Sequence, residues 1–152
     1  MSGARVTITV DDAAVRAQLE RLLEQVQRPT DALREIGEVL QQSTQRRFAT
    51  ETAPDGSRWA PNSPVTLTRK TSRQILTEHG FLGDTIRYQL TADRQGVAVG
   101  SNRVYAAMQQ FGGTKADHPH LWGDIPARQF LGVSAADRTT ILDIFTDYLG
   151  SA

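Results

Sequence analysis

The chain of 152 residues carries no net formal charge, and 39% of its residues are hydrophobic. This length and composition predict a single domain, residues 1–152, with a hydrophobic core, and they exclude a disordered chain. The chain has no apolar run near the roughly 20 residues of a membrane span, no visible secretory signal and no cysteine. We therefore expect no membrane contact, no disulfide, and folding in a reducing cytoplasm.

The first predicted elements are a strand and a helix. Residues 6–10 alternate Val or Ile with Thr, as in a half-buried strand, and Asp11 or Asp12 can cap a following helix. The apolar side chains of that helix recur at helical spacing until Pro29 interrupts the pattern. They are Val15, Leu19, Leu22, Leu23 and Val26.

A second helix is predicted from Thr30, whose side chain can cap it, to about Thr50. One face of this helix is largely apolar and is expected to meet the core. Its members are Leu33, Ile36, Leu40, Thr44 and Phe48.

Residues 50–74 are predicted to form an irregular arm. They contain Pro54, Gly56, Pro61 and Pro64, and such a density of proline and glycine argues against a helix or a central strand. An irregular segment of this length is uncommon in a compact domain unless it has a function.

The segments that follow the arm alternate like strands and then become helical. Residues 85–91 and 95–101 predict the two strands of a hairpin, and residues 104–111 predict a short helix that ends at Gly112. Residues 112–124 then form a polar loop.

The last element is a helix with a recognisable start. Ser134, with Asp137 three positions later, resembles a capping box. Its expected apolar stripe consists of Ile141, Leu142, Phe145, Tyr148 and Leu149. Together the elements predict an α+β fold in which a small, mostly antiparallel sheet packs against two or three helices and carries a long extended arm.

Motifs of catalysis are missing from the sequence. It contains no phosphate-binding glycine loop, no Gly-x-Ser-x-Gly and no cysteine nucleophile. His118 and His120, with Asp117 and Asp124, form the candidate metal site. Their His-Pro-His spacing places the imidazoles on a kinked loop instead of one helical face, so we expect no metal, no cofactor and no enzymatic activity.

Three separated segments combine turn residues with large side chains. They are residues 54–61 (PDGSRWAP), residues 99–112 (VGS, followed by YAAMQQFG after a short gap) and residues 125–132 (IPARQFLG). In each segment a turn or an element boundary holds one or two large side chains on a rigid support. This arrangement is typical of a docking surface and not of a reaction centre.

Trp59 in the first segment has two interpretations. The Pro54-Asp55-Gly56 sequence predicts a tight turn just before it. The side chain can fold back into the core of its own domain, or it can anchor in a neighbouring subunit, as aromatic side chains at loop tips do. We favour the neighbouring subunit, because Pro54, Gly56 and Pro61 hold Trp59 outside the regular elements.

The other interface candidates also have alternatives. Tyr105 and Phe111 lie on one short helix, where core packing is the favoured interpretation and an interface is the alternative. Arg128 is favoured as a surface salt bridge, with a carboxylate on a neighbouring subunit as the alternative. Arg58 and Phe130 complete the set of candidates for a subunit or partner interface.

Arg69, Lys70 and Arg73 form a basic run near the end of the arm. A solvated face is the ordinary interpretation, and a face toward DNA or a partner is the alternative. Contact with DNA here would be to phosphate, without reading of sequence. The neutral net charge argues against a free-standing nucleic-acid binder.

In this order, the three segments resemble the phage virion morphogenesis family, the tail-completion proteins of long-tailed phages. The resemblance covers roughly residues 30–135, but residues 112–124 match no pattern of the family, which leaves the partner of that loop open. The positions that carry the resemblance are Asp55, Gly56, Trp59, Gly100, Tyr105, Ala106, Phe111, Gly112, Pro126, Arg128 and Phe130.

The resemblance implies a structural virion protein at the head–tail junction, assembled in the bacterial host cytoplasm, that completes the tail or neck. It also implies a ring, commonly of six copies, around a channel through which DNA passes without sequence-specific contact. The implied partners are further copies of the chain, the head connector, and tail tube or terminator proteins. A ring fits the residues too, because an arm that reaches the next subunit secures a heterologous interface.

Two other functions stay open. One is a DNA-binding accessory protein of phage assembly, which the basic run favours. The other is a small metal-dependent enzyme that uses the histidine loop.

Overall fold

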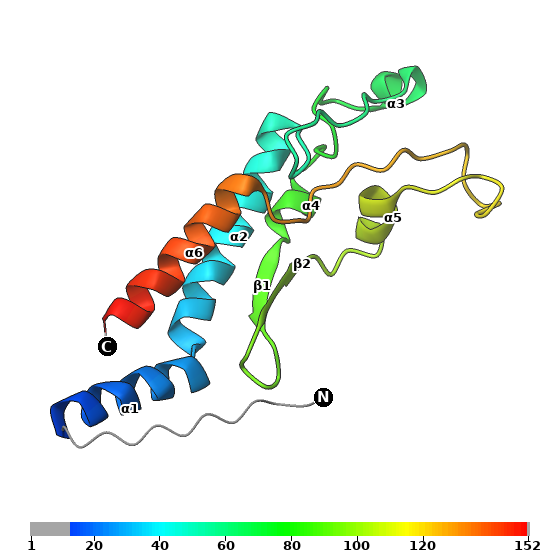
Figure 1. Ribbon diagram of the computed structural model, residues 1–152. Helices are drawn as coiled ribbons and strands as arrows, with labels where there is room; N and C mark the ends of the chain where they lie inside the picture. Colours follow the sequence, from blue (N-terminus) through cyan, green and yellow to red (C-terminus); the bar gives the residue numbers. More distant parts are fainter. Residues whose placement is uncertain (1–12, 152) are drawn as a thin grey trace.

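The structure is organised along one long helix (Figure 1). The computed structural model describes residues 13–151, so the strand expected at residues 6–10 and its capping aspartates lie outside the described residues. Helix α2, Thr30–Thr50, forms the axis of the molecule, and helix α6, Ala135–Gly150, lies beside it. Helix α1, Ala13–Gln27, precedes α2 and also contacts α6.

The two predicted N-terminal helices are confirmed, but the predicted cap is wrong. Thr30 is already helical, and Pro29 holds the cap position, where its carbonyl accepts a hydrogen bond from the Leu33 N–H at 2.9 Å. At the other end, Glu51 takes a left-handed conformation with φ 55°, and its N–H donates to the Arg47 carbonyl. The chain therefore changes direction sharply at the end of α2, where the arm begins.

Strands β1, Arg87–Leu90, and β2, Val97–Gly100, form the expected antiparallel hairpin. One face of the hairpin packs against α2. Gly37 of α2 makes this close approach possible, because a Cβ at that position would lie 2.4 Å from a ring carbon of Tyr88. The confirmed fold class is thus a small α+β fold, with a two-stranded sheet on a helical layer.

Three short helices lie outside this layer: α3, Pro64–Arg69; α4, Phe81–Asp84; and α5, Ala106–Phe111. The prediction of a wholly irregular arm is wrong at α3. Ser63 caps that helix by accepting a hydrogen bond from the Thr66 N–H at 3.2 Å, and Pro64 occupies its first turn, where no amide donor is needed.

Two hydrophobic clusters lie along α2. The first surrounds Phe48 and Phe130 near the C-terminal end of the helix, and the second joins Ala32 and Ile36 of α2 to Ile144 of α6. The capping box at Ser134 and Asp137 is confirmed at the start of α6. Leu142, expected on the apolar stripe of α6, is 63% exposed, because Ile144 takes the central place in the cluster.

Candidate functional site: the strap, the arm and the outer end

Residues 125–132, which we call the strap, cross the first cluster between the 112–124 loop and α6. The Phe130 side chain is fully buried, with its ring centroid 5.5 Å from that of Phe48. The Gln110 side-chain oxygen accepts hydrogen bonds from the N–H groups of Phe130 and Leu131, both at 3.0 Å. Its amide group donates to the Leu131 carbonyl at 3.1 Å, so one side chain of α5 holds the centre of the strap.

Trp59 enters the same cluster from the arm. Its side chain is 5% exposed, meets the Phe48 ring edge-on at 5.4 Å, and donates from the indole N–H to the Gln129 carbonyl at 2.8 Å. The chain doubles back to place it there, with the Trp59 N–H bonded to the Glu51 carbonyl at 2.9 Å. This corrects the interpretation of Trp59 as an anchor in a neighbour, because its pocket lies within its own subunit.

Arg128 pairs with no carboxylate among the described residues, which corrects its favoured interpretation as a surface salt bridge. The alternative, a carboxylate on a neighbouring copy, stays a prediction. The Arg128 guanidinium donates to the carbonyls of Ala60 and Pro61, both at 2.8 Å, and the Arg128 backbone N–H donates to the Gln109 carbonyl at 2.7 Å. Burial lowers the pKa of Arg128, but an arginine remains protonated in a protein. The residue therefore ties the strap to the arm by charge-assisted hydrogen bonds.

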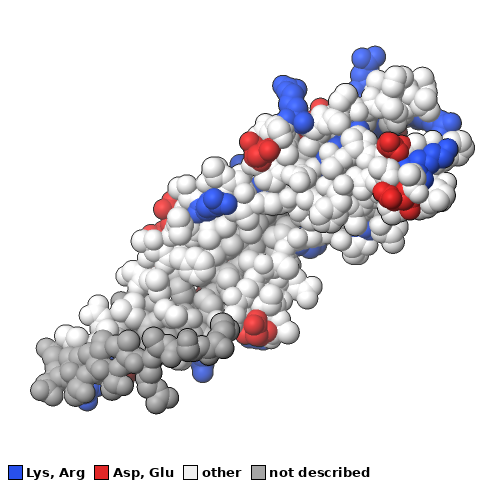
Figure 2. Space-filling view, turned by 45° about the vertical axis from the view of Figure 1, so that its right-hand side comes forward, with Lys and Arg blue, Asp and Glu red and all other residues white. Residues whose placement is uncertain are grey.

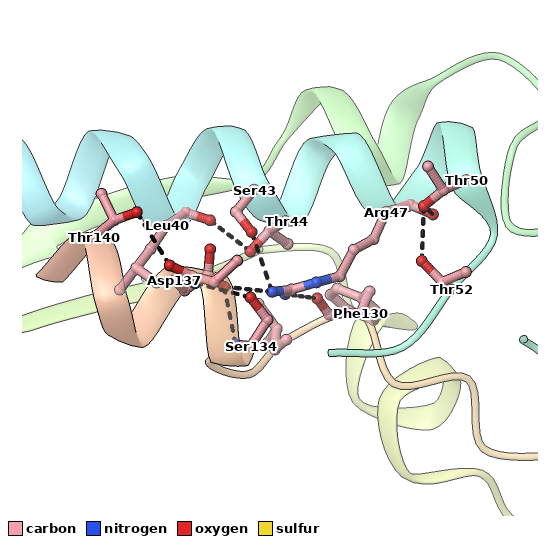
Figure 3. A network of polar contacts seen from close by, with 12 residues as sticks. Leu40, Ser43, Thr44, Arg47, Thr50, Thr52, Phe130, Ser134, Asp137 and Thr140 are labelled. Atoms are coloured by element: carbon pink, nitrogen blue, oxygen red, sulfur yellow. Dashed lines mark hydrogen bonds and ion pairs between the residues drawn. The ribbon is translucent and has the colours of Figure 1, made fainter. Parts of the chain in front are cut away.

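A buried ion pair ties the strap to two helices (Figure 3). The Arg47 guanidinium lies 2.7 Å from the Asp137 carboxylate, and both side chains are only 7% exposed. Arg47 also donates to the Phe130 carbonyl at 2.8 Å and to the Ser43 hydroxyl at 3.2 Å. A single side chain of α2 thus reaches the strap and the first turn of α6.

The Asp137 carboxylate has enough partners to remain charged. Burial pushes the pKa of Asp137 upward, but hydrogen bonds from Ser134 and Ser43 and the Arg47 charge outweigh it and hold this pKa below its usual value. Burial likewise lowers the pKa of Arg47, and the neighbouring Asp137 offsets part of that effect. The pair is therefore ionised near neutral pH, which makes the loss of either member costly.

The three sequence segments that carry the family resemblance meet at this strap. A Cβ at Gly132 would lie 2.6 Å from the Pro54 ring, so the first and third segments are in contact. Gly112, with φ 71°, lies against the third segment, because a Cβ there would be 2.7 Å from the Ile125 carbonyl oxygen. Many of the characteristic residues of these segments therefore make contacts within the chain, which corrects the prediction that the segments form a docking surface.

Glu51 closes the base of the arm. Its carbonyl accepts from the Trp59 N–H, and its side-chain oxygen accepts from the Ile75 N–H at 2.8 Å. Glu51, the C-cap of α2, therefore fixes Trp59 within the arm and Ile75 just after it. The turn within the arm follows the predicted chemistry, since Asp55 accepts a hydrogen bond from the Ser57 N–H at 2.9 Å and Gly56 has φ 86°.

The exposed candidates gather at the opposite end of the molecule from α1. We call this region, made of α3, α5 and residues 112–124, the outer end (Figure 1). Tyr105 is 41% exposed and Phe111 is 77% exposed, which corrects the favoured interpretation of core packing for both. Trp122 is 92% exposed, and the Arg69 guanidinium lies 5.6 Å from its ring centroid.

Charges at the outer end have both signs and are intermixed (Figure 2). Arg58 and Arg73 are exposed, and the Lys70 ammonium donates to the Gln74 carbonyl. With Arg69 beside Trp122, two cations of the predicted basic run already contact their own subunit. The region therefore offers aromatic and mixed charged groups instead of a uniformly basic surface.

The described residues contain no group of three or more histidine, aspartate or glutamate side chains placed to hold a metal ion. His118 and His120 stack edge-on at 5.9 Å between ring centroids. Asp117 accepts from the Thr114 hydroxyl at 2.8 Å, and Asp124 accepts from the Lys115 N–H at 2.8 Å. Within residues 13–151, no helix is long and apolar enough to span a membrane.

Sequence reasoning missed the three side chains that organise the site: Arg47, Glu51 and Gln110. A signal existed for Arg47, which continues the apolar face of α2 yet carries a charge. Such a residue predicts a buried partner of opposite charge. Glu51 and Gln110 had no comparable signal, because their partners are backbone groups of distant segments.

The fold and the site define a small α+β protein in which the three sequence segments contact one another, an internal arrangement that we call the clasp, and in which the outer end is exposed. The model of the phage virion morphogenesis family matches residues 10–150, and the chain belongs to that family. It is 28% identical over 153 residues to a putative capsid assembly protein G of Escherichia phage Mu, covering 97% of this chain and 96% of the Mu protein. No solved structure matches the chain.

Proposed function

We propose that this protein is a structural subunit that completes the phage tail or neck and joins the tail to the head, without catalytic turnover. Membership of a virion morphogenesis family supports a role in building the particle. The description of the Mu relative as a capsid assembly protein supports the same role. The proposed place of action is the head–tail junction of the virion, after assembly in the host cytoplasm.

The observation that carries the proposal is the amount of surface that the chain leaves uncovered. The whole chain exposes 10905 Å², whereas a compact monomer of 16.7 kDa exposes roughly 7,600 Å². Residues 1–12 and 152, which the structure does not describe, have a surface of at most roughly 2,000 Å², the value for a fully extended chain of that length. They can therefore explain only part of the difference. More than about 1,000 Å² remains, which is the scale of a specific protein interface.

The exposed side chains are those that interfaces use. Trp122, Phe111 and Tyr105 are aromatic, and aromatic residues are enriched in interface centres. Because charges at the outer end are mixed, a protein partner suits this surface better than DNA does. We place copies of the same chain there, in a ring of about six that fits the closed symmetry of most homo-oligomers, together with the head connector and tail tube or terminator proteins. DNA passes through the lumen of this ring without sequence-specific contact.

The test is deletion of the gene from the phage, with complementation by the wild-type chain and by Trp122→Ala. Electron microscopy of the deletion is expected to show filled heads and separate or unstable tails, and Trp122→Ala is expected to complement poorly. Normal infectious particles from the deletion would contradict the proposal. Retardation of DNA by the purified chain at physiological salt would instead favour the DNA-binding alternative.

A further inference from the structure

Among residues 13–151, neither edge of the hairpin of β1 and β2 has a neighbouring strand. The Thr91 N–H donates to the Gly96 carbonyl at 2.9 Å, so residues 91 and 96 form a hydrogen-bonded pair. Pairs alternate along an antiparallel ladder, and the register therefore makes Tyr88 with Val99, and Leu90 with Val97, non-hydrogen-bonded pairs. The backbone groups of these residues point away from the partner strand.

The two edges of the hairpin differ in how they are covered. On the β1 side, the outward Tyr88 N–H donates to the Gln41 side chain of α2 at 3.1 Å. On the β2 side, the outward groups belong to Val97 and Val99, and among the described elements only β1 and α2 pack extensively against this strand. A two-stranded sheet is marginal by itself, and an open edge invites a third strand.

The β2 edge also has a defined chemical polarity. Val97 packs against the second cluster and Val99 against the first, so the side of the edge that faces α2 is apolar. Ala98 and Gly100 face the other way, beneath an open hollow of about 570 Å³. A strand that alternates β-branched apolar residues with small polar ones matches this edge on both faces.

We propose that residues 6–10 of a second copy of this chain pair with β2 as the third strand. In this segment Val6, Ile8 and Val10 continue the apolar face, and the two threonines lie toward Ala98 and the hollow. Main-chain hydrogen bonds to Val97 and Val99 provide the attachment, as in other cases of strand addition. The inference rests on the proposed function, because it adds, at the hairpin, a second contact between neighbouring copies in the ring.

The donor is a second copy because the chain's own segment is too short to reach. The C-terminal end of α1 lies at the hairpin turn, where the Gln95 side chain donates to the Gln27 carbonyl at 2.9 Å. From there α1 runs away from the hairpin (Figure 1), and its 15 residues extend about 21 Å. Val10 lies three residues before Ala13 and can be at most about 11 Å from it, so it cannot return to Val97.

Cross-linking tests this pairing directly, since the chain has no cysteine. Ala98 directs its backbone groups toward β1, so opposite a third antiparallel strand it occupies a non-hydrogen-bonded position. The Cα separation there is about 4.5 Å, which a disulfide can bridge. Thr7→Cys or Thr9→Cys in one copy is mixed with Ala98→Cys in a copy carrying a larger tag, both as free protein and in purified particles.

A disulfide-linked dimer of unequal chains is expected for one of the two donor positions. The double variant that combines this donor position with Ala98→Cys is then expected to give a ladder that ends at the closed ring, and the other double variant is not. Absence of the mixed dimer from free protein and from particles alike, or a double variant that joins only within one chain, would overturn the inference.

A second measurement uses Ile8→Pro, which removes an amide donor from the middle of the pairing segment, with Ser2→Pro as the matched control. Association is expected to weaken at least tenfold for Ile8→Pro alone, while the melting temperature of the dilute monomer stays unchanged. Undiminished association, or a clearly lower monomer melting temperature, would overturn the strand exchange. Rings that survive Ile8→Pro would leave the proposed function standing, whereas a deletion with normal particles would reject that function by itself.

Discussion

The two tryptophans of this chain occupy opposite kinds of environment. Trp59 is 5% exposed, with its ring against Phe48 and its indole N–H bonded to the strap, whereas Trp122 is 92% exposed and has only the Arg69 guanidinium over its ring among the described residues. Both sit on segments without regular structure, in sequence contexts rich in proline and glycine. The difference shows that an irregular segment can be core or surface, depending on which distant backbone groups it meets.

The largest expected effect separates these two side chains. Trp59→Ala should lower the free energy of unfolding of the isolated subunit by about 3–5 kcal/mol, because it empties a packed aromatic site. Trp122→Ala, the matched control, should change it by no more than about 0.5 kcal/mol and should act on assembly instead. Chemical denaturation of both variants, beside their assembly yield, checks the comparison. A stable Trp59→Ala subunit would return this residue to the interface.

The next effect concerns the charge inside the clasp. Arg47→Ala leaves the Asp137 carboxylate buried without its cation and should cost about 3 kcal/mol. Arg69→Ala at the outer end, where the side chain is exposed, should cost less than about 1 kcal/mol. Equal urea midpoints for the two variants would contradict the view that only the first arginine supports the core.

A smaller effect is expected at the base of the arm. Glu51→Ala removes the oxygen that accepts the Ile75 N–H and should cost about 1.5 kcal/mol, the value of a hydrogen bond to a charged group. Residues 60–74 should then be cut faster by protease, while the core stays folded. Glu51→Gln keeps an acceptor oxygen and serves as the control. Cleavage at the same rate in all three proteins would mean that Glu51 does not hold the arm.

The smallest effect is a pH dependence. The folded-state pKa of Asp137 is below its usual value, so its contribution to stability is present above about pH 4 and is lost as pH falls through the folded pKa. The urea midpoint of the wild type should therefore drop more between pH 5 and pH 2.5 than that of Asp137→Asn. Exposed Asp55 and half-buried Glu78 also have lowered pKa values, from hydrogen bonds with Ser57 and Thr71, but the wild type and Asp137→Asn share both groups. Parallel curves would show that Asp137 does not contribute.

The sequence predicted the elements whose residues follow a locally repeating pattern or begin with a recognisable cap. The helical spacing of apolar residues located α1 and α2, the alternation of residues 85–101 located the hairpin, and Ser134 marked the start of α6. Helix α3 was missed because one short turn with a capping serine looks like an irregular proline-rich segment. A helix of only six residues is too short to show the repeating apolar spacing by which longer helices are predicted.

The candidate site could be predicted only in part. The turn at Pro54–Gly56 shows where the chain reverses, but not what the following tryptophan meets. That depends on Gln129, 70 residues away. The ion pair of Arg47 and Asp137 joins positions 90 residues apart and has no local signature beyond a charge on an apolar face. Exposure of Phe111 and Trp122 likewise follows from the arrangement of segments and not from their composition.

The long separation of the clasp contacts has a consequence for the order of events during synthesis. Phe48 emerges 82 residues before Phe130, and at about 5–20 residues per second the ribosome needs roughly 4–16 s to cover that interval. The aromatic residues of the outer end are all translated inside this interval, before the strap that supports them exists. In the proposed assembly, a partner that binds these aromatic residues on the completed fold would therefore discriminate finished chains from truncated ones.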